Sequence, residues 1–481
     1  MKRRKLKLEH LIPIRNGYCF FPLLLIWLFS FSIAHAQINV HQASSNQTNK
    51  KPNVVIIMAD DLDSRQLSCY GGQNLQTTNI DRLAKEGIKF NNMIASEAMC
   101  VPTRASLFTG LYPARHGAYQ NHKPVYAGLK SVVHYLQDEN YRVALSGKDH
   151  VTKPRAIFPF QIIPGFETNC VATSDEYSLD SIAEFIGENK DPFCLFIMSI
   201  NPHAPWTVGD PSEFDPAKLK LPAHWVDTEI TRKQFTNYLA EVRRLDDQVG
   251  DIIRLLEQNN QLENTIIIFL GEQGPQFPGG KWTLYDNGQK SSMLIRWPKV
   301  ISPNSQTDAI VQFEDITPTL VAIAGGSPDP KLDGRSFLPV ITKTKNNHRE
   351  FAFGIHNNHP EGPAYPMRSI RDTRYKLIVN LLPDSNYYNK FMMNPKNKKS
   401  VYSSWLQKAA RDQNAQFLTQ RIAKHPAVEF YDLLNDPDEL TNLADHIDQQ
   451  ERIKVMRSNL AQWMKVQGDS GSAMDIPLVK P

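Results

Sequence analysis

Four continuous apolar runs, each followed closely by charged, histidine or amide residues, constrain the fold of this chain more than any other feature. The runs cover residues 53–58, 141–145, 193–199 and 265–270. Strands that are apolar on both faces are typical of a parallel sheet covered by helices on both sides. Helical patterns lie between the runs, and the longest is Asn237–Gln258. This alternation predicts an α/β fold with a large mixed, mostly parallel sheet flanked by helices.

Polar side chains follow each run, at the edge of the sheet where open α/β folds keep their sites. They are Asp60 and Asp61 after the first run, Lys148 and His150 after the second, His203 after the third, and Glu272 and Gln273 after the fourth. Adjacent carboxylates such as Asp60 and Asp61 offer the oxygen ligands that a hard divalent cation prefers. The alternative is a capping or turn role, because Asp-Asp pairs are common.

The pattern changes after residue 345. Short strand candidates at 351–356, 367–370, 375–379 and 429–433 are joined by a polar, Asn- and Lys-rich stretch, with helical patterns near 401–421 and 448–466. We predict a catalytic domain over residues 52–345 and a smaller C-terminal α+β subdomain over 346–481 that contributes to the substrate pocket. The Lys- and Asn-rich segment 386–400 is a candidate contact for an acidic sugar, although such runs are usually only solvated.

The N-terminus has the pattern of a secretory signal peptide. A basic segment, Met1–Lys7, precedes an apolar run over residues 18–33 and the small-residue site Ala34-His35-Ala36. Cleavage before Gln37 would leave a polar, flexible lead-in over residues 37–51 and a secreted or periplasmic protein with no stable membrane span. The alternative is an uncleaved anchor, for which the run is short.

Charge and cysteine content exclude some classes of function. The chain carries +4, but residues 1–36 contribute +5, so residues 37–481 carry −1. No broad basic surface for nucleic acid is expected. Five cysteines are present, and Cys19 lies in the predicted signal peptide. The remainder are too sparse for a disulfide framework, and no bridge can be assigned.

Cys100-Val101-Pro102-Thr103-Arg104 matches the pattern C-x-P-x-R. Alone it also fits a buried cysteine in an ordinary loop. A helix that begins near Pro102 would direct its N-terminus toward an anion at Cys100.

With these motifs, the chain resembles the formylglycine-dependent sulfatases of the alkaline-phosphatase-like superfamily over nearly all of residues 37–481. Further segments that carry the resemblance are 52–61, 69–71, 109–113, 115–117, 201–206, 315–319, 332–336 and 372–376. Residues 277–286 are similar to the sulfamidase and heparan-sulfatase branch. The resemblance implies that a formylglycine-generating enzyme or an anaerobic maturase oxidises Cys100 to formylglycine (3-oxoalanine), whose hydrate attacks sulfur.

The resemblance also implies a divalent metal. Its ligands would be Asp60, Asp61, the modified Cys100 and the pair Glu272-Gln273, where the family usually has Asp followed by Asn or His. Both residues of this departing pair still offer oxygen. Ca²⁺ is therefore expected in preference to Mg²⁺, because it tolerates irregular oxygen geometry. The alternative is a weakened or lost metal site.

Other roles follow from matching residues to the family pattern. Lys281 and His203 would bind sulfate oxygens and assist the leaving group, and His150, paired with Lys148, would help release sulfate. Arg104 would pair with the formylglycine or the metal carboxylates, and His116 would support the formylglycine. His356, Asn357, His359 and Arg368 are candidate substrate-binding residues, or else part of a polar loop.

The sequence therefore predicts a secreted sulfatase that acts on a sulfated carbohydrate, either a glycosaminoglycan or an algal polysaccharide, or an oligosaccharide derived from one. Three alternatives stay open. They are a sulfamidase that cleaves N-sulfoglucosamine, a phosphodiesterase or phosphonate hydrolase of the same superfamily, and a non-catalytic binder of sulfated glycans.

Overall fold

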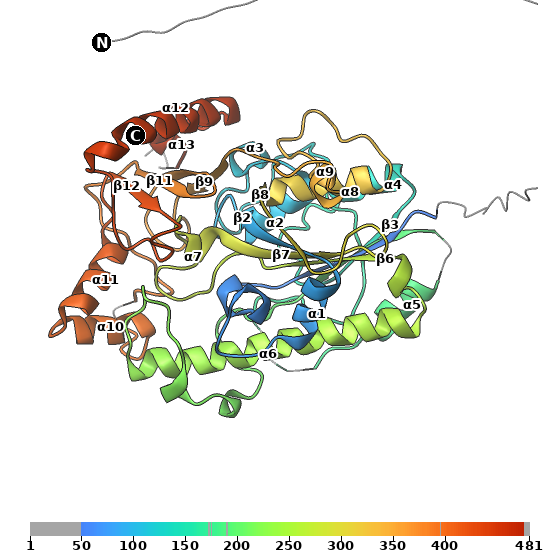
Figure 1. Ribbon diagram of the computed structural model, residues 1–481, viewed down its shortest axis with the longest axis horizontal. Helices are drawn as coiled ribbons and strands as arrows, with labels where there is room; N and C mark the ends of the chain where they lie inside the picture. The colour runs from blue at the N-terminus through green and yellow to red at the C-terminus, as the bar shows by residue number, and fades with distance from the viewer. Residues whose placement is uncertain (1–49, 172–173, 175, 189–190, 395, 476–481) are drawn as a thin grey trace, which may run out of the picture. The chain divides into compact units, whose positions relative to one another are not determined.

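The predicted large sheet is present, and its strand order is β4-β3-β5-β1-β6-β7-β2-β8 (Figure 1). The computed structural model describes residues 50–171, 174, 176–188, 191–394 and 396–475, so the predicted signal peptide and the lead-in before residue 50 lie outside the described residues. The strands are β1 (Asn53–Met58), β2 (Ile88–Ile94), β3 (Arg142–Gly147), β4 (Gln161–Ile162), β5 (Phe193–Met198), β6 (Thr265–Leu270), β7 (Lys290–Arg296) and β8 (Ser305–Gln312).

The four predicted apolar runs form β1, β3, β5 and β6, which pair in parallel at the centre of the sheet. β7 runs antiparallel to both β6 and β2, so the sheet is mixed, as predicted. We did not predict β2, β7 and β8. Each carries polar residues, such as Asn91 and Asn92 in β2, where the register with β7 and β8 shifts at a bulge.

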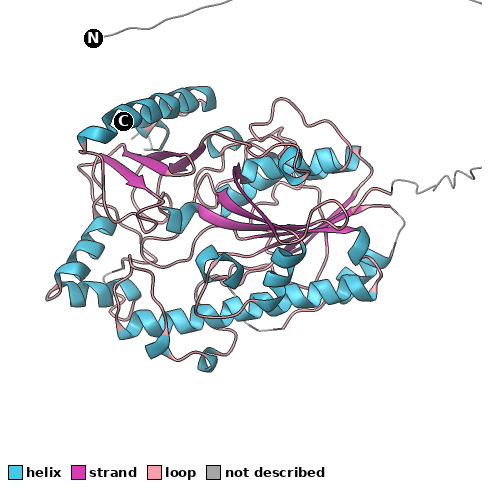
Figure 2. Cartoon of the chain, viewed as in Figure 1, coloured by secondary structure: helices cyan, strands magenta, loops and turns pink. Residues whose placement is uncertain are grey.

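Helices cover both faces of this sheet (Figures 1 and 2). The helices of this part of the chain are α1 (Thr78–Glu86), α2 (Cys100–Thr109), α3 (Pro113–His116), α4 (Val132–Asp138), α5 (Asp180–Gly187), α6 (Glu229–Gln258), α7 (Asp286–Gln289), α8 (Ile316–Ile323) and α9 (Leu338–Ile341). Side chains of β1 alternate between the faces. Val55 and Ile57 pack in the cluster that contains the apolar face of α6, whereas Val54 and Ile56 pack in the cluster that contains α2 and α4. Burial on both faces explains why β1 is apolar throughout.

The predicted C-terminal strands form a second, antiparallel sheet with the order β12-β11-β10-β9. Its strands are β9 (Ala352–His356), β10 (Met367–Arg371), β11 (Tyr375–Asn380) and β12 (Val428–Asp432), and the nearby helices are α10 (Val401–Ala409), α11 (Gln413–Ala423), α12 (Gln450–Gln467) and α13 (Ser472–Asp475). The single helical stretch expected over 401–421 is two helices. The Asp412 side chain accepts from the Ala415 amide, which starts α11 as a new helix.

The described residues from Lys51 to Asp475 form one compact unit that includes both sheets. α10 reaches the long helix α6, where the Trp405 indole N–H donates to Thr231 Oγ1 at 2.8 Å. α6 begins at Glu229, earlier than the predicted Asn237, because the Thr228 side chain caps it by accepting from the Thr231 amide. Within the described residues, none of the helices has the length and apolar character needed to span a membrane.

Candidate active site

Cys100 lies at the first position of α2, beside the C-terminal end of β1, and is fully buried. Its Sγ is 3.5 Å from Asp60 Oδ1, 4.0 Å from Asp61 Oδ1 and 3.2 Å from Lys281 Nζ. The helix therefore begins at the cysteine, slightly before the predicted Pro102. Its N-terminal amides and partial positive charge favour an anion at this point.

The thiol of Cys100 is held in its neutral form. Burial raises its pKa well above the usual value, Asp60 and Glu272 raise it further, and the cations nearby do not offset them. A thiol is a good nucleophile only as the thiolate. The unmodified cysteine is therefore poorly suited to attack an ester, which agrees with the predicted need for oxidation.

Asp60 and Lys148 form a buried ion pair at the ends of β1 and β3. Burial would raise the pKa of Asp60, but Lys148, His203 and Arg104 together hold it well below its usual value. The Asp60 carboxylate therefore stays ionised in a site closed to solvent. The pKa of Lys148 is raised despite burial, chiefly by Asp60.

Arg104 lies one helical turn after Cys100 and binds Glu272, with Nε donating to Oε1 at 2.6 Å. It also lies 3.9 Å from Asp60 Oδ1. Burial raises the pKa of Glu272 to about 8, against the opposing effect of Arg104. The predicted pairing of Arg104 with the metal carboxylates therefore has a geometric basis, and Glu272 is its main partner.

The acidic residues fit a hard divalent cation. One ligand atom each from Asp60, Asp61, Cys100 and His203 lie within 4.8 Å of one another. Gln273 completes the cluster: its Nε2 donates to Asp61 Oδ1, while its buried Oε1 has no partner among the described residues. Exchange of the amide oxygen and nitrogen would direct Oε1 toward the same point. The donor set is rich in oxygen, as Ca²⁺ and Mg²⁺ require.

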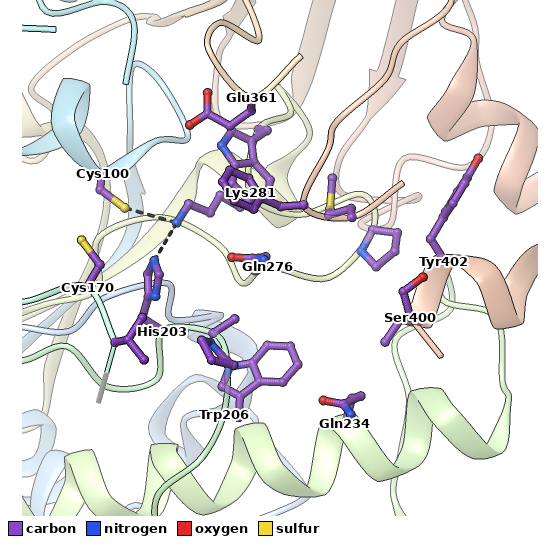
Figure 3. Close-up of a pocket in the computed structure, with 18 of the residues that line it drawn as sticks. Cys100, Cys170, His203, Trp206, Gln234, Gln276, Lys281, Glu361, Ser400 and Tyr402 are labelled. Carbon is purple, nitrogen blue, oxygen red and sulfur yellow. Dashed lines mark hydrogen bonds between the residues drawn. The ribbon is translucent and has the colours of Figure 1, made fainter. Parts of the chain in front are cut away.

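Lys281 and His203 meet beside the nucleophile. Lys281 Nζ is 2.8 Å from Asp61 Oδ2 and 3.3 Å from His203 Nε2 (Figure 3). Burial and the nearby Lys281 together lower the pKa of His203 to about 4. At neutral pH the pair therefore consists of a cationic lysine and a neutral imidazole.

A cavity of about 500 Å³ opens onto this cluster and includes Cys100, His150, His203 and Lys281 in its lining (Figure 3). His150 Nε2 lies 3.3 Å from Cys170 Sγ, and burial lowers the pKa of His150 to about 2. The structure thus brings to one place all of the predicted catalytic residues except His116, and all of the predicted metal ligands.

His116 is buried behind α2 instead. Its Nε2 contacts Ser106 Oγ at 3.2 Å, and its Nδ1 accepts from the Ala118 amide at 3.1 Å. Among the described residues, its hydrogen bonds do not include Cys100. The arrangement gives His116 a role in holding α2 rather than a direct contact with the formylglycine.

The four predicted substrate-binding residues are not in the cavity lining. Arg368 is buried and paired with Asp469 and Asp475, and Asn357 Oδ1 accepts from the His359 amide. His356 is fully buried, 4.0 Å from Glu97. The charge of Arg368 is therefore balanced by Asp469 and Asp475 of the C-terminal segment.

His356 gives a test of this structural role. Burial, His425 and Arg368 lower its pKa to about 3, so acid protonates the unfolded chain first, near pH 6.5. The contribution of His356 to the free energy of unfolding is fully present above about pH 6.5, and it falls by about 2 kcal/mol at pH 5. Measured by urea unfolding, the free energy of unfolding of His356→Gln should fall by about 2 kcal/mol less than that of wild type between pH 7.5 and pH 5. A changed KM with unchanged pH dependence would instead support substrate binding.

Several residues of the cavity wall were not identified from the sequence. They are Asn121, Trp206, Gln276, Trp282, Glu361 and Tyr402. Trp206 and Trp282 lie inside segments that the family resemblance covers, yet nothing in the sequence directed them into the cavity. Phe391, Asn397 and Lys399 also line it. These three belong to the segment 386–400, for which an acidic-sugar contact was predicted.

Comparison with known proteins agrees with this geometry. The family model "Sulfatase" matches residues 52–326, and "N-sulphoglucosamine sulphohydrolase, C-terminal" matches residues 279–425. An ulvan-active sulfatase of Formosa agariphila is 31% identical over 455 residues, covering 91% of this chain and 85% of that protein. Human N-sulphoglucosamine sulphohydrolase is 25% identical, covering 85% of this chain and 89% of that protein.

A solved structure of a protein in complex with its substrate D-glucosamine-2-N,6-O-disulfate has a similar fold. Its TM-score is 0.68 at 20% identity, covering 88% of this chain and 99% of that chain. The matched family model spans more than half of the chain and contains both Cys100 and the carboxylates around it. The chain therefore belongs to the sulfatase family of sulfuric ester hydrolases.

Proposed function

We propose that this protein hydrolyses sulfate esters on a sulfated carbohydrate, with a formylglycine made from Cys100 as nucleophile and a divalent cation, Ca²⁺ in preference to Mg²⁺, beside it. The observation that carries the proposal is the position of Cys100. It starts a helix at the inner end of the cavity, in contact with Asp60, Asp61 and Lys281.

The formylglycine would supply a hydrated aldehyde, one hydroxyl of which attacks sulfur, where a neutral thiol could not. Asp60, Asp61, Gln273 and Glu272 would hold the cation, whose chemistry is to stabilise negative charge on oxygen. Glu272 and Gln273 depart from the usual ligand pair, but the unpartnered buried oxygens Glu272 Oε2 and Gln273 Oε1 favour retention of binding.

The cationic side chains would bind the sulfate group and the charge that develops during cleavage. Lys281 is buried and in contact with Cys100 Sγ, so its ammonium acts at short range in a site of low dielectric. His203 is neutral before substrate binds, and a bound sulfate would raise its pKa, so that it takes up a proton from solvent and can donate it to the leaving oxygen. His150 also lines the cavity, and a bound sulfate would raise its pKa from about 2, which would favour acceptance of a proton as sulfate is released.

A carbohydrate fits the rest of the cavity. Trp206, Trp282, Phe391 and Tyr402 supply aromatic surface, and Gln276 and Asn397 supply amides. Aromatic faces with a few convergent polar groups are typical of sites that bind a ligand of this size. The relatives named for ulvan and for N-sulphoglucosamine favour a polysaccharide or its oligosaccharides. The N-terminal pattern of residues 1–36 favours export, to the periplasm or the medium.

Sulfate release tests the proposal. We expect protein co-produced with a maturase to release sulfate from ulvan oligosaccharides or sulfated glucosamines, and to hydrolyse phosphate esters more slowly. The peptide that contains Cys100 should show the mass of the aldehyde. Chelation of divalent ions should reduce the rate, and Ca²⁺ should restore it better than Mg²⁺. Faster turnover of phosphate or phosphonate diesters would contradict the proposal, and release from N-sulfate alone would identify a sulfamidase.

A further inference from the structure

Two buried polar atoms in the cavity wall are unpartnered, and the metal and sulfate roles do not use them. One is the acceptor Glu361 Oε2, and the other is the donor Trp282 Nε1; neither has a hydrogen-bond partner among the described residues. Both side chains are almost fully buried, and both residues line the cavity with Cys100 and Lys281. Buried polar groups in folded proteins are nearly always paired, so an unpaired donor and acceptor in one binding cavity call for a ligand.

Glu361 is held close to the nucleophile through Asn121. The Asn121 amide nitrogen donates to Glu361 Oε1 at 2.8 Å, and Asn121 Oδ1 accepts from the Val101 amide at 3.4 Å. Val101 follows Cys100 directly, so one side chain separates Glu361 from the start of α2. Asn121 orients the carboxylate and leaves its second oxygen unused. Figure 3 shows Glu361 on the same side of the cavity as Lys281.

Trp282 is fixed in an unusual backbone conformation. Its φ is 66°, in the left-handed region that a bulky side chain seldom adopts. Its amide donates to Ala98 O at 3.0 Å, and its carbonyl accepts from the Tyr387 hydroxyl at 3.3 Å. Such strain persists where the surrounding structure enforces it, and it is concentrated at functional sites. The indole stacks with Phe391, with ring centroids 5.9 Å apart, and Lys281 Nζ lies 5.1 Å from its centroid.

We infer that Trp282 and Glu361 together recognise a free hydroxyl on the sulfated sugar, on a carbon next to the one that carries the sulfate. A hydroxyl can donate to Glu361 Oε2 and accept from Trp282 Nε1, so it satisfies both groups at once. An ammonium would leave the indole N–H unpaired, and a carboxylate would be repelled by Glu361. This inference rests on the proposed function and specifies its substrate as a sulfate ester with a neighbouring free hydroxyl.

Paired substrates and conservative variants test this inference. The substrates are a monosulfated methyl glycoside with the neighbouring hydroxyl, its deoxy analogue, and 4-nitrophenyl sulfate. For wild type, we expect the deoxy sugar to have a kcat/KM about 10- to 100-fold lower than that of the hydroxyl sugar. Trp282→Phe and Glu361→Gln should each lower kcat/KM for the hydroxyl sugar by a similar factor. Neither variant should lower kcat/KM for the deoxy sugar much below its wild-type value. Both variants should lose less on 4-nitrophenyl sulfate, which lacks the hydroxyl, than on the hydroxyl sugar.

The reason for choosing glutamine is geometric. Asn121 keeps an oxygen toward itself, so the new NH₂ group takes the position of Oε2 and presents a donor where an acceptor was. Matched controls are Trp463→Phe, which also removes an unpaired indole N–H but outside the cavity, and the exposed Glu350→Gln. Neither control should change the ratio of kcat/KM between the hydroxyl sugar and the deoxy sugar.

Equal losses on the sugar and on 4-nitrophenyl sulfate would overturn the inference, because they would indicate a structural role. So would a wild-type enzyme that does not distinguish the deoxy sugar. Calorimetric binding of both sugars to Cys100→Ser protein gives the same comparison without turnover, and we expect the same ratio in Kd. If no ester releases sulfate, the proposed function fails, while the binding ratio still decides the hydroxyl subsite.

Discussion

Cys100→Ala is expected to lower kcat/KM for sulfate release by at least about 10⁴-fold, because it removes the side chain that we propose as the precursor of the nucleophile. The thiol is buried at the start of α2 and makes only weak contacts through sulfur, so folding should be retained. Sulfate release by ion chromatography measures the activity, and calorimetry with a sulfated oligosaccharide measures binding, which should persist.

Cys170→Ala is the matched control for this variant. Cys170 lines the same cavity and contacts His150, but it lies outside the C-x-P-x-R motif. We expect its activity to stay within a few-fold of wild type, and the aldehyde mass at residue 100 to be unchanged. Full activity in Cys100→Ala would contradict the assigned nucleophile.

Arg104→Ala should produce the largest loss of stability among single changes at the site. Arg104 is fully buried and binds Glu272 at 2.6 Å. Removing one partner of a buried ion pair leaves the other without compensation and costs about 3–5 kcal/mol. Without Arg104, the pKa of Glu272, which burial already raises to about 8, should rise further. Urea denaturation should show the loss, and activity of the folded fraction should fall as well.

Arg368→Ala separates stability from chemistry. Arg368 is equally buried and binds two carboxylates, those of Asp469 and Asp475, but it lies outside the cavity lining. A comparable loss of stability is expected, with kcat per folded molecule retained. If Arg104→Ala kept wild-type kcat in its folded fraction, Arg104 would have no role beyond folding. If Arg368→Ala raised KM selectively, the prediction that Arg368 binds substrate would be supported.

The central part of the fold was predictable because burial on both faces leaves a clear signal in sequence. β1, β3, β5 and β6 are continuous apolar runs, whereas β2 and β8 at the far side of the sheet carry Asn, Ser, Gln and Asp and were missed. The polar ends of the predicted runs meet because the strands are parallel. For His356 and Arg368, polarity in sequence was no guide to position, because it does not distinguish an exposed loop from a buried site; both lie outside the cavity lining, and their contact with substrate stays a prediction.

By itself, the sequence determined the parallel core and the C-x-P-x-R motif, since these depend on local pattern and on the order of strands, and the family resemblance supplied the candidate catalytic cations. Only the tertiary structure decided which side chains form the wall around the nucleophile. Trp282 and Glu361 lie 79 positions apart in the chain, and neither belongs to a periodic pattern. Their common cavity exists because the C-terminal sheet and its loops fold against the ends of the central strands, a contact between distant segments that no local signal encodes.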